Sequence, residues 1–223
     1  MQMETRSKIA GAVIALLALT GLGLRYSLFL SQAWDSGLST WRATGNFCSY
    51  FTVLVNLLVV LVFMAPGSFF RDARIRGAVT LYAVLVSLVY EAMLRRVWHP
   101  GGGEFLASLL LHDAVPFAVT AHWLLLREKG ALRGSHPFIW LGFPIVYLAF
   151  VFVRGAFTGW WLYPFMDAAA LGYLRVLLNA AALLGLLLVL GWGMVLWDRR
   201  GMRAPAEDGE LDEDGALPDL SGA

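Results

Sequence analysis

A threonine and a histidine, each inside a long apolar segment, are the residues of this chain with the clearest potential for chemistry. Thr52 lies in NFCSYFTVLVN and His112 in ASLLLHDAVPF. An imidazole can accept the proton of a hydroxyl that attacks an acyl carbon, and a neutral threonine is a weak nucleophile without such a base. If both segments are membrane helices that start at the same face, both residues lie roughly 10 Å below that face. The pair therefore predicts a nucleophile and its general base.

Further polar residues are expected in the same half of the membrane as this pair. Thr52 and Asn56 are four residues apart, so they share one face of a helix. Polar groups are costly in hydrocarbon. When several helices each place one in the same half of the membrane, this indicates a polar cavity that opens to that side. The residues expected to line or support this cavity are Asn46, Ser49, Asn56, Glu91, Arg95, Asp113, Arg154 and Asp167.

The imidazole of His112 needs a partner that orients it. Asp113 follows His112 directly and faces about 100° away on a helix, so it is poorly placed for this role. Asp167 and Glu91 are the better candidates to orient the ring. Both remain open at this point.

Simpler interpretations exist for several of these residues. A lone threonine in a membrane helix commonly bonds to its own backbone or packs at a helix interface. Glu91 and Arg95 have the spacing of an ion pair within one helix. Asn46 has a side chain suited to capping a helix. The residue pattern alone does not separate these roles from catalysis.

The composition predicts the elements that must position these groups. Apolar residues make up 59% of the chain and charged residues 15%, whereas about a quarter of an average soluble domain is charged. This composition excludes a soluble domain. We expect an all-α, polytopic membrane protein with a bundle of six transmembrane helices within one domain, residues 1–200. The expected spans are residues 9–30, 47–64, 78–97, 105–126, 138–153 and 168–197.

The distribution of basic residues predicts the orientation of this domain. Connections on the N-terminal side carry eleven basic residues: Arg6, Lys8, Arg71, Arg74, Arg76, Arg127, Lys129, Arg133, Arg199, Arg200 and Arg203. The opposite side carries five: Arg42, Arg95, Arg96, Arg154 and Arg175. The positive-inside rule then places both termini in the cytoplasm and the chain in the plasma (inner) membrane. Aromatic residues expected to anchor the outer interface are Trp34, Trp41, Trp98, Trp160, Trp161 and Tyr163.

The C-terminal residues 201–223 differ sharply from the rest of the chain. From residue 204 onward they carry acidic residues and no basic one: Glu207, Asp208, Glu210, Asp212, Glu213, Asp214 and Asp219. A segment this polar cannot bury enough apolar surface to fold alone. We expect a disordered acidic tail in the cytoplasm.

The sequence also limits cofactors and partners. Cys48 is the single cysteine and belongs to no CxxC motif, so neither a disulfide framework nor a zinc site is expected. The expected chemistry needs no metal or organic cofactor. The net charge of +1 indicates no nucleic-acid partner. The oligomeric state stays open.

Other functions for a polar cavity in the membrane remain open. In a small-solute transporter, Glu91, Asp113 and Asp167 would relay protons, although the two halves of the chain show no repeat. A retinal protein is excluded, because it would need a lysine in a late span and the lysines are Lys8 and Lys129. A haem protein would need histidines on facing helices, whereas the histidines expected within spans, His112 and His122, lie on one helix. A non-catalytic lipid-binding protein is the remaining alternative.

Three segments resemble a known family of membrane hydrolases. They are FCSYFTVLVNLL, LLHDAVPF and RGAFTGWWLYPFMD. They are similar to segments of the androgen-induced-protein family, six-span enzymes that use a threonine and a histidine on fatty acid esters of hydroxy fatty acids, and of a group of bacterial six-span proteins.

The resemblance implies that Thr52 is the nucleophile and His112 its base. The substrate would be a lipid or another long-chain ester. An acyl-threonine intermediate would form and then be hydrolysed. Asn46, Ser49 or Asn56 would donate hydrogen bonds to the oxyanion.

Overall fold

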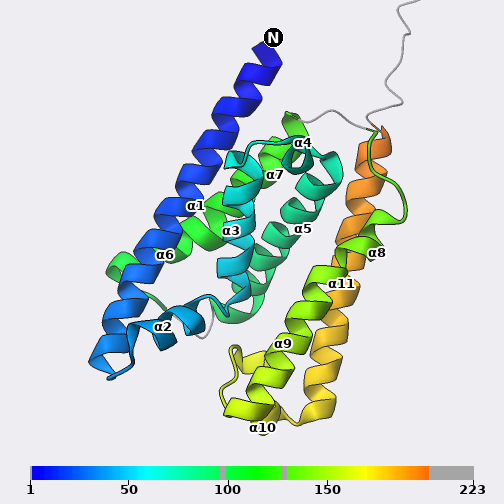
Figure 1. The fold of residues 1–223 in the computed structure, drawn as a ribbon. Coiled ribbons are helices and arrows are strands. Elements are labelled where there is room, and N and C mark those ends of the chain that lie inside the picture. The colour runs from blue at the N-terminus through cyan, green and yellow to red at the C-terminus, as the bar shows by residue number, and fades with distance from the viewer. Residues whose placement is uncertain (1, 96–98, 127–129, 201–223) are drawn as a thin grey trace, which may run out of the picture.

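The computed structural model describes residues 2–95, 99–126 and 130–200, and the regular structure of these residues is entirely helical (Figure 1). Five helices are long and apolar enough to cross a membrane, or six if one bent pair is a single span. The prediction of an all-α bundle with membrane-spanning helices is therefore confirmed. The expected acidic tail, residues 201–223, lies outside the described residues.

Most of the expected spans correspond to continuous helical segments. The first is α1 (Gln2–Asp35), and the third is α5 (Ala73–Val89), which η1 (Tyr90–Leu94) extends. The fourth comprises α6 (Gly102–Leu109), η2 (Leu110–Ala114) and α7 (Val115–Leu125). The fifth comprises α8 (His136–Trp140) and α9 (Gly142–Thr158). Both η1 and η2 are π-helical turns.

The expected sixth span is interrupted near its start. It contains α10 (Ala168–Leu171) and α11 (Tyr173–Arg200), separated by Gly172. Gly172 has φ of +77°, a conformation that favours glycine because it has no Cβ. Asp167 caps α10 by accepting hydrogen bonds from the backbone of the next turn. The long membrane helix therefore begins at Tyr173 and not at Ala168.

The second expected span is not one straight helix. It divides into α2 (Thr40–Phe47) and α3 (Phe51–Met64), which meet at 79°. The prediction of a continuous helix from residue 47 to residue 64 is wrong in this respect. At 14 residues, α3 is about 21 Å long, whereas the hydrocarbon core of a bilayer is about 30 Å thick. By itself, α3 is therefore too short to cross the membrane.

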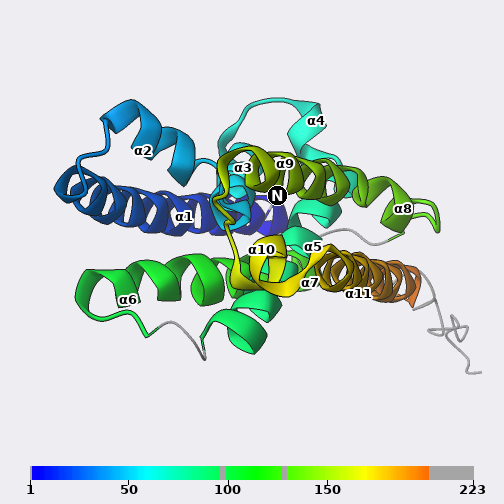
Figure 2. The same cartoon turned by 90° about the horizontal axis from the view of Figure 1, so that it is seen from below.

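The short helix α3 occupies the centre of the molecule. It packs against α1 on one side and α5 on the other, and α5 also contacts α7 and α11. In Figures 1 and 2, α3 and α5 separate α1 and α6 from α9 and α11. Val53, Val55, Val59 and Val62 of α3 are buried, and they belong to three different apolar clusters. The N-terminus of α3 is thereby surrounded by other helices.

Candidate functional site

The fold brings Thr52 and His112 together. Thr52 is the second residue of α3, and His112 is the central residue of η2. His112 Nε2 lies 3.4 Å from Thr52 Oγ1. This separation is longer than a well-formed hydrogen bond, but catalytic hydrogen bonds commonly tighten only when substrate is bound. The threonine hydroxyl and the imidazole are therefore within reach of one another.

Thr52 differs from other threonines of the bundle. Thr44, Thr80, Thr120 and Thr158 each donate a hydrogen bond to the carbonyl four residues earlier. Since α3 begins at Phe51, Thr52 has no carbonyl of its own helix at that position. Its hydroxyl is directed to His112 instead. The backbone-bonded role that is common for a membrane threonine does not apply here.

Ser108 orients the imidazole of His112. His112 Nδ1 lies 3.1 Å from Ser108 O and 3.3 Å from Ser108 Oγ. A carbonyl oxygen can only accept, so Nδ1 carries the proton and the neutral ring keeps an unprotonated Nε2. This nitrogen faces Thr52, as a general base must. The orienting role expected of Asp167 or Glu91 therefore belongs to Ser108, which sequence reasoning missed.

Two π-helical turns present the aromatic rings of the site. Tyr90 of η1 stacks on His112 of η2 with ring centroids 4.1 Å apart and an interplanar angle of 18°. Pro116 follows η2 and has no N–H for the carbonyl of His112, and its ring excludes that carbonyl from α-helical geometry. A π-helical turn is wider than an α-helical turn, so η2 accommodates Pro116 without this hydrogen bond. Such π-turns are frequent at functional sites because they change the direction of one side chain.

The break between α2 and α3 is stabilised by two tyrosines. The hydroxyls of Tyr147 and Tyr163 each accept a hydrogen bond from Phe51 N, both at 3.0 Å. Tyr147 in turn donates to Ser49 O at 3.0 Å. Backbone groups outside a helix are tolerated at membrane depth only where the protein satisfies them. These bonds therefore satisfy backbone groups of the break and hold the start of α3 in place.

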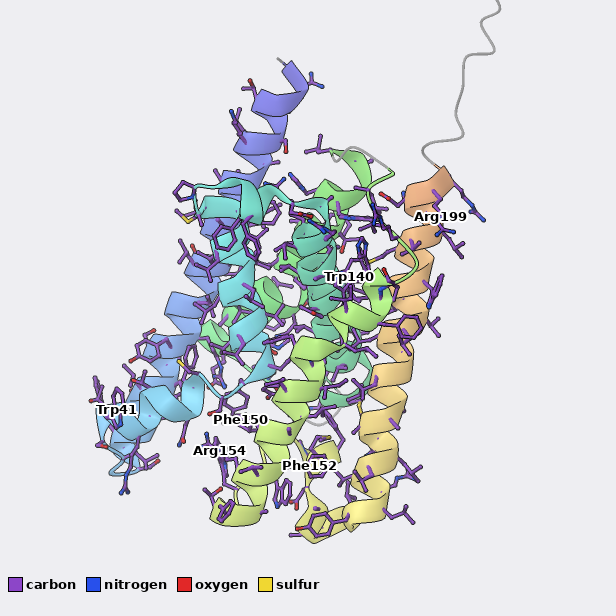
Figure 3. The ribbon with its side chains drawn as sticks, turned by 45° about the vertical axis from the view of Figure 1, so that its right-hand side comes forward. Trp41, Trp140, Phe150, Phe152, Arg154 and Arg199 are labelled. Carbon is purple, nitrogen blue, oxygen red and sulfur yellow. The ribbon has the colours of Figure 1, made fainter. Side chains whose placement is uncertain are left out.

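Arg154 connects the same break to α9. Its guanidinium donates to Asn46 Oδ1 at 2.5 Å and to Ser49 Oγ. It also packs over the ring of Trp160, 4.3 Å from the centroid. Figure 3 shows Arg154 on the side of α9 that faces α2 and α3. Asn46, Ser49 and Arg154 are thus brought together as a support for the break.

The three residues expected to bind an oxyanion are engaged elsewhere. Asn46 Oδ1 and Ser49 Oγ accept from Arg154, and Ser49 Oγ donates to Gly45 O at 2.7 Å. Asn56 Nδ2 donates to Thr52 O at 2.8 Å and to Leu111 O at 3.4 Å. Asn56 therefore links α3 to η2 at the residues beside Thr52 and His112. Its role is to position the site.

The remaining expected residues form contacts away from the Thr52 hydroxyl. Arg95 forms ion pairs with Glu91 at 2.5 Å and with Asp113 at 2.8 Å. The spacing of Glu91 and Arg95 is that of an intrahelical pair, as one interpretation of the sequence held. Asp167 accepts from Ala169 N and Ala170 N. None of these acids supports the imidazole.

Two cavities meet at Thr52 and His112. The smaller, about 70 Å³, is mostly apolar and extends between α5, α9 and α11. The larger, about 260 Å³, extends towards α1 and α6 and is lined by Arg25 and Ser108. Thr52, His112 and Tyr163 line both cavities. A molecule with two arms could place its central carbonyl beside the hydroxyl and one arm in each cavity.

Tyr163 has a contact at the site that sequence reasoning did not predict. It was expected at the membrane interface, among the aromatic anchors. Its hydroxyl instead lies at the N-terminus of α3, where Phe51 N donates to it. Burial raises the pKa of Tyr163 to about 12, so the hydroxyl keeps its proton at neutral pH. The segment TGWWLYP shows no hydrophobic periodicity that would predict the position of the Tyr163 hydroxyl.

Close packing of α1 against η2 fixes the position of His112. A Cβ on Gly21 would lie 2.8 Å from Leu111 Cδ2, whereas one on Gly23 would meet nothing within 4 Å. We expect Gly21→Ala to lower the free energy of unfolding by about 1–3 kcal/mol, because the side chain overfills this contact. Thermal unfolding in detergent measures the change. Gly23→Ala on the same helix is the control, and equal melting temperatures for the two variants would contradict the prediction.

The arrangement of the described side chains contains no group of three or more histidine, cysteine, aspartate or glutamate residues that could hold a metal ion. No protein-family model, no curated protein and no solved structure matches the chain. A proposal about function therefore depends on the geometry of the Thr52 and His112 site.

Proposed function

We propose that the protein is an intramembrane threonine hydrolase that acts on lipid esters of the fatty acid ester class. The observation that carries this proposal is the pairing of Thr52 Oγ1 with His112 Nε2, 3.4 Å apart, where the other nitrogen of the ring is held by a carbonyl. This tautomer leaves Nε2 free to accept a proton. The resemblance to the androgen-induced-protein family supports the same assignment.

The first step of the proposed reaction is attack by Thr52 on the ester carbonyl. The Thr52 oxygen forms a bond to the carbonyl carbon while His112 Nε2 takes the hydroxyl proton. Negative charge collects on the carbonyl oxygen. The first N–H of α3, Phe51 N, is already bonded to the hydroxyls of Tyr147 and Tyr163, and the positive end of the helix dipole lies at the same place. The Tyr163 O–H is the proposed oxyanion donor, in place of Asn46, Ser49 and Asn56.

The second step returns the enzyme to its starting state. His112 gives its proton to the departing alcohol, and the acyl group stays on Thr52. Water then attacks the acyl-threonine while His112 accepts a proton from it, and His112 returns this proton to Thr52 Oγ1 as the acyl–oxygen bond breaks and the fatty acid is released. The apolar cavity between α5, α9 and α11, at about 70 Å³, suits the first carbons of an acyl chain, and the larger cavity suits the alcohol arm. This chemistry needs no metal or organic cofactor.

The proposed location follows from charge and hydropathy. Helices long and apolar enough to cross a membrane indicate an integral membrane protein. The excess of basic residues on the N-terminal side favours the plasma (inner) membrane with both termini in the cytoplasm. The Thr52 site then lies in the outer half of the bilayer, where its substrate is a lipid or long-chain ester in the membrane.

An acyl-enzyme experiment tests the proposal. Purified protein in detergent is mixed with a panel of long-chain esters, quenched in acid and digested for mass spectrometry. We expect an acyl group on the peptide that contains Thr52, and Thr52→Ala to lower hydrolysis at least a thousandfold because the nucleophile is lost. Thr52→Ser, which keeps a hydroxyl, is expected to retain part of the rate.

Thr120→Ala is the matched control, since Thr120 lies in a membrane helix and bonds to Pro116 O. It should leave hydrolysis unchanged. If wild-type protein hydrolyses no ester on the panel but retains the esters on purification, the cavity is a lipid-binding site and the hydrolase proposal fails.

A further inference from the structure

A second pocket lies at the opposite end of α3 from Thr52. It has a volume of about 310 Å³ and lies between α1, the C-terminal end of α3 and the start of α5. Ser7, Lys8, Met64 and Arg76 are among the residues that line it. The proposed hydrolase uses none of them. The pocket is on the N-terminal side of the bundle, where basic residues are concentrated.

The lining of this pocket is basic. Lys8 and Arg76 come from different helices, and none of the described residues that line the pocket is acidic. Arg76 is held in place because its Nε donates to Phe70 O at 3.3 Å and its guanidinium lies over the ring of Phe63, 5.5 Å from the centroid. The pocket therefore favours a ligand that carries negative charge.

An exposed apolar stripe on α3 leads to the pocket. Leu57, Leu61 and Met64 are 39%, 48% and 59% exposed, and their spacing places them on one face of the helix. Met64 also lines the pocket. A ligand with a charged group at Lys8 and Arg76 could therefore extend an apolar chain along this stripe. Free phosphate would not use the stripe.

We propose that this pocket binds the headgroup phosphate of an anionic phospholipid, with one acyl chain along Leu57, Leu61 and Met64. Basic pockets between membrane helices recognise such headgroups, and two cations from different helices hold a phosphate between them. The bound lipid joins α1, α3 and α5 at the end of the bundle where α3 terminates. The site is separate from Thr52 and does not depend on the proposed hydrolysis.

A competing role for the two cations is to neutralise the end of α3. The last carbonyls of a helix carry partial negative charge, and basic side chains stabilise them. This role predicts a loss of stability on removal of the cations whether or not lipid is present. The lipid role predicts a loss of the response to anionic lipid.

Thermal unfolding with added lipid separates the two roles. Purified full-length protein in neutral detergent is titrated with phosphatidylglycerol, with phosphatidylcholine of the same acyl chains, and with glycerol 3-phosphate. We expect phosphatidylglycerol to raise the melting temperature more than either of the others. Lys8→Gln with Arg76→Gln should weaken the apparent affinity for phosphatidylglycerol roughly tenfold or more.

The control is Arg199→Gln with Arg200→Gln, which removes two exposed cations from the end of α11 on the same side of the bundle (Figure 3). This variant should keep the preference for phosphatidylglycerol. If the Lys8 and Arg76 variant does not fold, Lys8→Gln alone gives the same comparison, because Lys8 is exposed.

Three results would overturn the proposal. They are an unchanged preference for phosphatidylglycerol in the Lys8 and Arg76 variant, an equal loss in the Arg199 and Arg200 variant, and an equal effect of glycerol 3-phosphate. The last would assign the pocket to free phosphate groups.

Discussion

His112→Ala is expected to lower the rate of ester hydrolysis by about 10²–10⁴-fold, the range typical of general base catalysis. Without the imidazole, Thr52 has no group at 3.4 Å to take its proton. The variant should still bind substrate, because most of the apolar cavity wall comes from other residues. Steady-state kinetics with the best ester of the panel measure the loss, which should lie in kcat and leave KM nearly unchanged.

His122→Ala is the matched control for this prediction. His122 is a buried histidine of the same membrane segment, but its Nε2 pairs with Ser7 Oγ at 3.0 Å, far along the chain from the site. We expect kcat to stay within about twofold of wild type, because the residue touches neither cavity at Thr52. An equal loss of kcat in both variants would show that the effect is structural and that His112 is not the base.

Tyr163→Phe is expected to lower kcat by about 10²–10³-fold, the usual effect of removing one oxyanion donor. The Tyr163 hydroxyl accepts from Phe51 N, lines both cavities beside Thr52 and keeps its proton at neutral pH. Its O–H can therefore donate to the carbonyl oxygen as charge develops there. The variant keeps the aromatic ring, so it removes the hydroxyl with little change in packing.

Tyr147→Phe provides a close comparison with Tyr163→Phe. Both hydroxyls accept from Phe51 N at 3.0 Å, but the proton of Tyr147 is donated to Ser49 O. We expect this variant to lose about 1 kcal/mol of stability through the missing hydrogen bond and to keep most of its kcat. Thermal unfolding and kinetics on both variants separate the roles. If both variants lose the same kcat, the tyrosines only hold α3 in place and the oxyanion role is wrong.

These predictions depend on a property of α3 that links fold to chemistry. A continuous second span would have buried the N–H groups near Thr52 in helical hydrogen bonds and offered its hydroxyl a carbonyl four residues earlier. The break after Phe47 removes both partners. The same break brings the Thr52 hydroxyl, the Tyr163 hydroxyl and the positive end of a helix dipole to one place.

The sequence by itself determined the fold class of this protein. Stretches of apolar residues of membrane-spanning length predicted the helical bundle, because hydropathy and helix length are local properties. The sequence also indicated Thr52 and His112 as residues at similar depth. Helical periodicity also predicted which residues share a helix face with them, such as Asn56, four residues after Thr52.

Only the tertiary structure decided where the second span breaks and which groups complete the site. The residues at the break, Cys48 to Tyr50, include no proline and read as part of an apolar run. The break persists because Tyr147 and Tyr163, 96 and 112 residues further along the chain, bind Phe51 N. Ser108, the partner of His112 in place of Asp167 or Glu91, lies only four residues before it, so helical periodicity could have indicated this contact. A hydrogen bond between distant segments depends on how the helices pack, and no local pattern of residues records that packing.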